Sequence, residues 1–328
     1  MKGSYRIIVQ NSNVRYDFEI HRNITIIKGD SATGKTTLVE MIHEYYENGI
    51  SSGIELSCTR ICTVLSGRDW KAVLETMKER IIFIDEGNAF IYTTEFARAV
   101  QQSNNYYVIV TREGLVNLPY SVEEIYGIRE SGKYASIKRT YNEFYHIYGK
   151  KNMLEHIVPT KIIVEDSNSG YEFFKGVSEN KKWHAVTANG KSNVFAKVIQ
   201  NMNEEKVLVI ADGAAFGPEM DRIVKLLGNN ENIVLFLPES FEWLILKSGV
   251  LDKREVKEIL AAPQEYIESG KYFSWERYFT ALLVEKTNDT YLKYTKKKLN
   301  AVYLQDGTKD KICKQIELES GFQINLLG

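Results

Sequence analysis

The sequence contains few of the residues that cross-link or break a chain. It has three cysteines and five prolines in 328 residues. Three cysteines are too few for a disulfide framework. Cys58 and Cys62 would supply only half of a metal site, because no second pair and no histidine cluster completes it. We therefore expect free thiols in a reducing, cytoplasmic environment.

The chain also lacks long apolar runs and a marked net charge. No run approaches the length of a membrane span, and residues 1–6 carry no apolar signal region, so we expect no membrane partner. The formal net charge of −1 gives no global basic field, and nucleic-acid binding would need a local basic patch. The length and the 44% hydrophobic content predict a globular protein of about two domains.

The strongest pattern that is present is a glycine-rich segment between a predicted strand at residues 24–27 and a predicted helix. The segment reads Gly29, Asp30, Ser31, Ala32, Thr33, Gly34, Lys35 and Thr36, and Thr37 continues into the helix. It matches G-x-x-x-x-G-K-[ST], the phosphate-binding P-loop, whose backbone N–H groups surround a triphosphate. We expect Lys35 to reach the β- and γ-phosphates and Thr36 to ligate Mg²⁺. The alternative is a tight glycine turn with an exposed lysine.

A second pattern fits the other half of an ATPase site. Residues 81–84 are four consecutive apolar residues, typical of a strand covered on both faces, and Asp85 and Glu86 follow at its carboxyl end. We expect Asp85 to hold Mg²⁺ through water and Glu86 to orient and deprotonate the attacking water. The alternative is a buried strand that ends in a turn. We expect ATP as the nucleotide, because the Asn-Lys-x-Asp element of guanine recognition is absent.

Alternating apolar residues at 4–20 predict a β-hairpin directly before the P-loop strand. This entry resembles the ATP-binding-cassette and SMC-like ATPases. Leu65, Ser66 and Gly67 resemble part of their signature motif, but the short gap between Lys35 and Leu65 has no room for the helical subdomain and glutamine loop of that family. Gly67 and Asp69 are better explained as a turn and an N-cap that open a helix at 70–78.

Another strand is predicted at residues 106–111. In many P-loop ATPases a polar residue at the end of this strand senses the γ-phosphate, which indicates Thr111 or Arg112; the alternative is a strand that simply ends in a polar loop. Many such ATPases complete their site with a neighbouring subunit, so we expect a homo-oligomer or a partner protein. A tyrosine-rich hairpin at 122–148 is predicted to close the first domain.

After Pro159 the chain repeats a strand followed by a helix four times, which predicts a parallel α/β sheet. The order of motifs resembles the Toprim domain of topoisomerases, primases and OLD-family nucleases. The resemblance implies that Glu165 closes the first strand, that Asp212 is the first acid of a later pair, and that Glu242 is a further acid. Such carboxylates would hold one or two Mg²⁺ ions during phosphodiester cleavage. The second acid of the pair is missing, unless Asp166, Glu239 or Glu242 replaces it.

The remaining residues are predicted to be mostly helical, and Lys296, Lys297 and Lys298 form either a solvated helix end or a phosphate-neutralising group near the acids. The predicted organisation is a P-loop ATP-binding domain at 1–157, a Toprim-like domain at 158–250 and a helical extension at 251–328. We expect an ATP-binding protein with ATPase activity whose nucleotide state regulates a domain that cleaves or binds nucleic acid. The alternatives are a nucleotide-dependent binding module with an inactive Toprim-like domain, and a small-molecule kinase.

Overall fold

The computed structural model of the protein describes residues 1–29, 34–131, 139–149, 159–179, 181–202, 206–228 and 230–321. The chain divides into two compact units. Unit 1 comprises Met1–Ile147 and Ala262–Ser274, and unit 2 comprises Tyr148–Ala261 and Trp275–Gly328. The domain boundary predicted near residue 157 lies outside the described residues, and the segment predicted as a helical extension contributes to both units.

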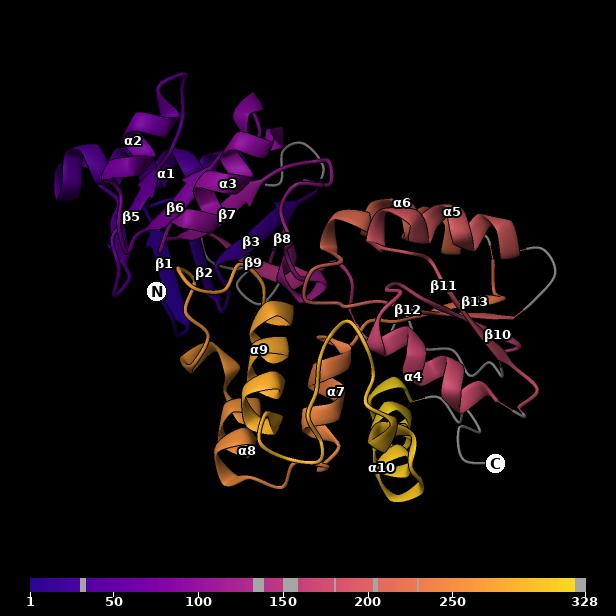
Figure 1. Ribbon diagram of the computed structural model, residues 1–328. Coiled ribbons are helices and arrows are strands. Elements are labelled where there is room, and N and C mark those ends of the chain that lie inside the picture. Colours follow the sequence, from indigo (N-terminus) through magenta and orange to yellow (C-terminus); the bar gives the residue numbers. More distant parts are fainter. Residues whose placement is uncertain are drawn as a thin grey trace. The chain divides into compact units, whose positions relative to one another are not determined.

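The described part of unit 1 contains one nine-stranded sheet, most of whose strands are labelled in Figure 1. The strand order is β4-β1-β2-β9-β8-β3-β7-β6-β5. Its strands are β1 (Tyr5–Gln10), β2 (Val14–Ile20), β3 (Ile24–Lys28), β4 (Glu55–Ser57), β5 (Cys62–Val64), β6 (Ile81–Ile84), β7 (Tyr106–Val110), β8 (Ile125–Glu130) and β9 (Thr140–His146). Both predicted hairpins are confirmed, because β1 pairs antiparallel with β2 and β8 pairs antiparallel with β9. The other half of the sheet, from β8 through β3, β7 and β6 to β5, is parallel.

Both faces of the parallel half are covered, as the apolar runs predict. Every residue of β7 is buried. Tyr106 and Val108 join the apolar cluster that includes residues of α1 (Lys35–Asn48), whereas the ring of Tyr107 meets Phe96 of α3 (Thr94–Gln102) at 6.1 Å between centroids. Because the strands of this half are parallel, the carboxyl ends of β3, β7 and β6 meet at one edge of the sheet.

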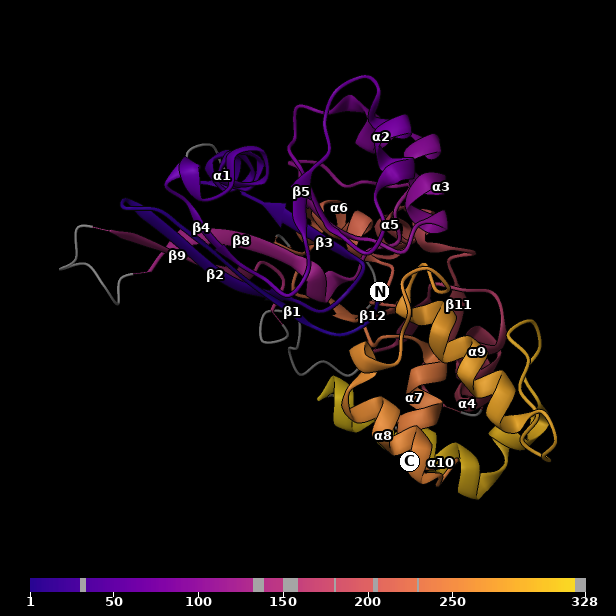
Figure 2. The same cartoon turned by 90° about the vertical axis from the view of Figure 1, so that its left-hand side faces the viewer.

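The nine-stranded sheet cannot be flat. β4 and β5 lie at its opposite edges, yet only residues 58–61 join them. Eight spacings of about 4.8 Å would separate the edges of a flat sheet by about 38 Å, whereas this connection spans at most about 18 Å. The sheet therefore curls, with α1 along one of its faces (Figure 2).

The remaining helices of unit 1 are short. They are α2 (Trp70–Thr76), α3 and the 3₁₀ turns Gly49–Ser52, Ala89–Tyr92, Val122–Glu124 and Pro263–Glu265. Thr93 caps α3, its hydroxyl accepting a bond of 3.1 Å from the Phe96 N–H. Asp69 precedes α2 as predicted, but its side chain makes no capping bond. The amino group of Met1 donates to the Ser269 hydroxyl at 2.9 Å, which ties residues 262–274 to unit 1.

Unit 2 contains the four strand–helix repeats that the sequence predicts. Its sheet has the order β11-β10-β12-β13 and all its pairings are parallel. The elements are β10 (Lys161–Val164), α4 (Ser169–Ser178), β11 (His184–Thr187), α5 (Lys191–Asn201), β12 (Val207–Ile210), the 3₁₀ turn Gly217–Glu219, α6 (Met220–Leu227), β13 (Ile233–Phe236) and α7 (Phe241–Lys247). In Figure 1, α5 and α6 lie on one face of this sheet, and α4 lies on the other.

Three more helices pack around α7 in unit 2. They are α8 (Arg254–Ala261), α9 (Trp275–Thr287) and α10 (Asp306–Ser320), and the 3₁₀ turn Ala301–Leu304 precedes α10. The expectation of a helix end at the lysine triplet is wrong, because Lys296 lies in an irregular segment between α9 and that turn. No helix among the described residues is long and apolar enough to cross a membrane.

Candidate functional site

The predicted phosphate loop connects β3 to α1 in unit 1. Lys35 opens α1, and its Nζ donates to the carbonyl oxygen of Gly29 at 2.9 Å. Only 6% of Lys35 is exposed, so the alternative of a glycine turn with an exposed lysine is wrong. Thr36 and Thr37 are exposed in the first turn of the helix. Four further predicted loop residues lie outside the described part of the chain, namely Asp30, Ser31, Ala32 and Thr33.

A tyrosine from the antiparallel hairpin holds the end of this loop. The hydroxyl of Tyr16, on β2, donates to the carbonyl oxygen of Gly34 at 2.8 Å. Gly34 has φ 84°, and a Cβ there would lie 2.7 Å from the Tyr16 hydroxyl oxygen, so only glycine fits. Burial raises the pKa of Tyr16, which keeps the phenol neutral and able to donate. The sequence analysis did not identify Tyr16 as a site residue.

The predicted acids follow β6 at the same sheet edge. Asp85 Oδ1 accepts a bond of 2.9 Å from the Glu86 backbone N–H. Glu86 is in turn held by Arg112, which follows β7: its Nε donates to Glu86 Oε2 at 3.0 Å and its Nη2 to Oε1 at 2.9 Å. This bidentate geometry is the strong form of the arginine–carboxylate pair. The residue predicted to act as base is therefore bound to one of the two predicted γ-phosphate sensors.

Thr111, the other predicted sensor, has a local structural role. It is fully buried, and its hydroxyl donates to the Glu113 carbonyl oxygen at 3.0 Å. The Thr111 hydroxyl oxygen also lies 3.2 Å from the hydroxyl oxygen of Tyr92. These contacts fix the turn that follows β7 and leave Arg112 as the side chain that reaches toward Glu86.

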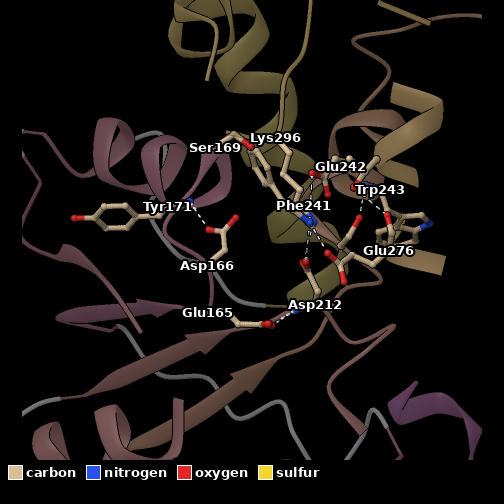
Figure 3. Close-up of polar contacts among 12 residues, drawn as sticks. Glu165, Asp166, Ser169, Tyr171, Asp212, Phe241, Glu242, Trp243, Glu276 and Lys296 are labelled. Carbon is tan, nitrogen blue, oxygen red and sulfur yellow. Dashed lines mark hydrogen bonds and ion pairs between the residues drawn. The ribbon is translucent and has the colours of Figure 1, made fainter. Parts of the chain in front are cut away.

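Two of the acids predicted in unit 2 lie together at the carboxyl ends of adjacent strands (Figure 3). Glu165 follows β10 and Asp212 follows β12, and the Asp212 backbone N–H donates to Glu165 Oε2 at 2.9 Å. Asp212 Oδ1 accepts from the Phe241 N–H at 3.2 Å, at the start of α7. Burial raises the pKa of both carboxyl groups, and the nearby Glu276 carboxylate raises them further.

Asp166 takes no direct part in this pair. Its Oδ1 accepts a bond of 3.0 Å from the Tyr171 N–H in the first turn of α4, so its carboxylate fixes the helix start. Gly190 has φ 112° and precedes α5, and its N–H donates to the Glu165 carbonyl oxygen at 2.7 Å.

Two glutamates from distant parts of the sequence complete the acid cluster, which we define as Glu165, Asp212, Glu242 and Glu276. Glu242 lies in the first turn of α7 and is 1% exposed. Its Oε1 accepts a bond of 2.8 Å from the Tyr294 hydroxyl, while its Oε2 has no hydrogen-bond partner among the described residues. Glu276 lies in the first turn of α9 and was not predicted.

One lysine forms ion pairs with three of the four acids of this cluster. Lys296 Nζ is hydrogen-bonded to Glu276 and lies 3.9 Å from both Asp212 Oδ2 and Glu242 Oε1 (Figure 3). Burial disfavours the ammonium, but the carboxylates of the cluster outweigh it and raise the pKa of Lys296. The Lys296 carbonyl oxygen also accepts a bond of 3.1 Å from the Ser169 N–H, which holds the segment on α4. Of the two alternatives for the lysine triplet, Lys296 thus lies near the acids, whereas Lys297 and Lys298 are exposed.

The segment directly after Asp212, where the second acid is absent, is tightly packed. A Cβ on Gly213 would lie 2.6 Å from the Leu237 carbonyl oxygen, and the Gly213 N–H donates to the Pro238 carbonyl oxygen at 2.6 Å. Ala214, where the Toprim pattern has its second acid, is 2% exposed. Glu242 and Glu276 instead bring carboxylates to Asp212 from α7 and α9.

The donor chemistry of the cluster suits a hard cation such as Mg²⁺. The buried, unpartnered Oε2 of Glu242 fits such a role, and a cavity of about 20 Å³, large enough for one water, adjoins Glu165 and Asp212. In the present arrangement, however, the Lys296 ammonium forms ion pairs with Asp212, Glu242 and Glu276. Over the described residues, no three His, Cys, Asp or Glu side chains are already arranged as metal ligands, either here or at Asp85.

The structure thus places the predicted site residues at one strand-end edge in each unit, and adds Tyr16 and Glu276. No protein-family model matches the chain, and no curated protein matches it.

Proposed function

We propose that unit 1 binds and hydrolyses ATP with Mg²⁺, and that its nucleotide state regulates the acid cluster of unit 2, which acts on nucleic acid. The observation that carries the ATPase proposal is the strand order. β7 lies between β3 and β6, so Lys35, Asp85 and Glu86 stand at one edge of one parallel sheet. Ligands bind at this edge in α/β sheets.

The chemistry follows from the positions of these side chains. Lys35 would exchange its bond with the Gly29 carbonyl oxygen for contacts to the β- and γ-phosphates, beside the N-terminus of α1. Bound magnesium would neutralise charge on these phosphates, with Thr36 and the water-linked Asp85 as its protein partners. Glu86, once released by Arg112, would orient the attacking water and accept its proton.

Calorimetry with ATP and Mg²⁺ tests the nucleotide site. We expect Lys35→Ala to lose at least tenfold in ATP affinity, because it removes the buried ammonium at the loop. Lys71→Ala is the matched control, since Lys71 is an exposed lysine of α2 that pairs with Glu95. Unchanged ATP affinity in the Lys35 variant would overturn the proposal.

The resemblance to Toprim domains and the convergence of four carboxylates support phosphodiester cleavage in unit 2. In this proposal Asp212, Glu242 and Glu276 would hold the divalent ion, which would stabilise charge on the phosphodiester. Lys296 would then contact a backbone phosphate. Glu165 positions Asp212 through the bond to its backbone N–H.

Nicking of supercoiled plasmid DNA with Mg²⁺ or Mn²⁺ tests this second activity. We expect nicking by the full-length protein and its loss in Asp212→Asn. Asp252→Asn is the matched control, because Asp252 is an exposed acid of the same unit that pairs with Lys257. Absence of nicking with ATP, with ADP and without nucleotide would overturn the cleavage proposal and leave the nucleotide site untouched.

A binding module without cleavage is the second candidate, and the pairing of Lys296 with the cluster favours it. In that case DNA or RNA would bind without being cut. Fluorescence anisotropy with labelled oligonucleotides distinguishes the two candidates, because binding by the wild-type protein that yields no product with Mg²⁺ or Mn²⁺ favours the module.

A further inference from the structure

Two cysteines flank the short connection that joins the opposite edges of the curled sheet in unit 1. Cys58 follows β4 and Cys62 is the first residue of β5, and both are free thiols. Cys62 is 4% exposed and belongs to the apolar cluster that includes α1, whereas Cys58 is only half-buried and packs against that cluster. The pair therefore consists of one accessible and one protected sulfur.

Both thiols line one cavity, and Cys62 Sγ donates to the Arg60 carbonyl oxygen at 3.8 Å, within the loop that joins the two cysteines. Interaction with the Cys62 side chain lowers the pKa of Cys58 to about 7, and interaction with Cys58 together with burial raises the pKa of Cys62. Near neutral pH the half-buried Cys58 is thus about half ionised to the thiolate, whereas the buried Cys62 stays a thiol. A thiolate beside a second thiol is the arrangement in which an attacking and a resolving cysteine operate.

A cavity of about 490 Å³ gives access to the pair. Both cysteines line it, together with Tyr45, Tyr46, Ile50 and Arg60. The cavity lies at the seam between β4 and β5 and contains none of the residues assigned to the nucleotide site. It is large enough for a small hydroperoxide, whereas the buried position of Cys62 leaves Cys58 as the sulfur that an oxidant meets first.

We propose that Cys58 and Cys62 form a hydroperoxide-reactive dithiol that closes to a disulfide. The Cys58 thiolate attacks one peroxide oxygen, the O–O bond breaks, and the released hydroxide or alkoxide takes up a proton. The sulfur is oxidised to sulfenic acid and the peroxide is reduced. The Cys62 thiol then attacks this sulfur and loses its proton, the S–O bond breaks, water leaves and the disulfide forms.

Formation of the disulfide would restrain the two edge strands of the sheet, β4 and β5. Because the two sulfurs belong to the ends of β4 and β5, a disulfide would cross-link its opposite edges through a five-residue loop. Cys62 packs in the same apolar cluster as Leu38 and Ile42 of α1, so oxidation would restrain the region that supports this helix. The inference does not depend on the proposed ATPase activity.

Treatment of the full-length protein with one equivalent of hydrogen peroxide, followed by alkylation and peptide mass mapping, tests the proposal. We expect a peptide containing a Cys58–Cys62 bond, two thiols lost per chain and full reversal by dithiothreitol. Cys313 is the internal control, because it is fully buried and burial raises its pKa to about 12. In Cys62→Ser, oxidation is expected to stop at a dimedone-trapped sulfenic acid on Cys58.

The rate of iodoacetamide alkylation against pH gives a second readout. For Cys58 the rate should rise through a midpoint near pH 7 and move to higher pH in Cys62→Ala, because the interaction that stabilises the thiolate is lost. Far-UV circular dichroism shows whether each variant is folded. Two results would overturn the proposal: no linked peptide from wild-type protein, or a Cys58 midpoint near that of an unperturbed thiol, about 8.5.

Discussion

At the scale of single residues, the pair between Arg112 and Glu86 gives a direct test of the ATPase mechanism. The side chain of Arg112 is 59% exposed and that of Glu86 is 31% exposed. An ion pair with this solvent exposure stabilises the bound position of Glu86 by at most about 1 kcal/mol. We expect Arg112→Ala to release the carboxylate and to raise basal ATP hydrolysis by up to about fivefold. Phosphate release under saturating ATP measures the change.

Arg129→Ala is the control, because Arg129 also forms an exposed ion pair, with Glu143 between β8 and β9. Its hydrolysis rate should equal that of wild type. A decrease in rate for the Arg112 variant would assign the guanidinium to phosphate contact and would contradict the holding role.

Two glycines with similar positive φ angles allow the cost of backbone strain on substitution to be measured apart from the cost of a steric clash at the phosphate loop. Gly34 and Gly53 have φ 84° and 72°, but only at Gly34 would a Cβ meet another atom, the Tyr16 hydroxyl at 2.7 Å. We expect Gly53→Ala to cost about 1 kcal/mol of unfolding free energy, and Gly34→Ala to cost at least about 1 kcal/mol more by displacing that hydroxyl.

Urea denaturation followed by circular dichroism measures both costs, and calorimetry measures ATP affinity. Gly53→Ala should bind ATP as wild type does, whereas Gly34→Ala should bind it at least tenfold more weakly. Equal destabilisation of the two variants would contradict the role of Tyr16.

The sequence identified the residues of the two sites unevenly, and the reason is physical. Lys35, Asp85, Glu165 and Asp212 each follow a strand with a strong apolar run, so their edge of the sheet could be predicted. Lys296 could not be distinguished from two adjacent lysines, because its burial depends on where the segment docks. Glu276 belongs to a helix whose position no local pattern specifies.

At the scale of elements, the irregular segment that carries Lys296 behaves as a strap across the acid cluster. The Tyr294 hydroxyl is bonded to Glu242 and Ser169, and the Lys296 carbonyl oxygen accepts from the Ser169 N–H. We expect Lys296→Met to lower the unfolding free energy by up to about 3 kcal/mol without divalent ions, because its removal leaves neighbouring buried carboxylates without their cation.

Divalent ions should offset this loss. An ion that binds only the folded variant stabilises it by mass action, so added Mn²⁺ should raise the melting temperature of Lys296→Met more than that of wild type. Lys297→Met is the matched control, because the neighbouring Lys297 contributes to none of the ion pairs of the cluster. An equal response of all three proteins would show that Lys296 and the ion do not share a position.

Strands and helices could largely be predicted, but their order in space could not. Period-two alternation predicted both hairpins of unit 1, and strand–helix repeats predicted the parallel sheet of unit 2. The curl of the nine-stranded sheet depends on pairings between β4 and β1 and between β2 and β9, which join segments far apart in sequence. Residues 251–328 were predicted to form a helical extension, yet α9 begins only at Trp275, because residues 262–274 return to unit 1.

At the scale of the whole molecule, the chain passes between the two units three times, after Ile147, Ala261 and Ser274. A single linker would predict two separable domains. Here a segment of unit 1 is bracketed in sequence by α8 and α9 of unit 2. Because α9 carries Glu276 of the acid cluster, the connection between the units leads directly into an element that builds the second site.

This connectivity leads us to expect reciprocal coupling between ATP and nucleic acid. If ATP changes the affinity for an oligonucleotide by some factor, the oligonucleotide must change the affinity for ATP by the same factor. We expect a factor of about 5–150, the usual range for coupled sites. Fluorescence anisotropy with labelled DNA, with and without ATP, and calorimetry with ATP, with and without DNA, measure the two factors independently.

Two variants locate the coupling. At an ATP concentration that fills only the wild-type site, Lys35→Ala should bind DNA with one affinity whether or not ATP is present, because its ATP affinity is expected to be much weaker. Asp212→Asn should keep wild-type ATP affinity in the absence of DNA, since the substituted carboxylate belongs to unit 2. Equal DNA affinity of the wild-type protein with ATP, with ADP and without nucleotide would mean that the units bind their ligands independently, and the regulatory half of the proposed function would then fail while each site could still be active by itself.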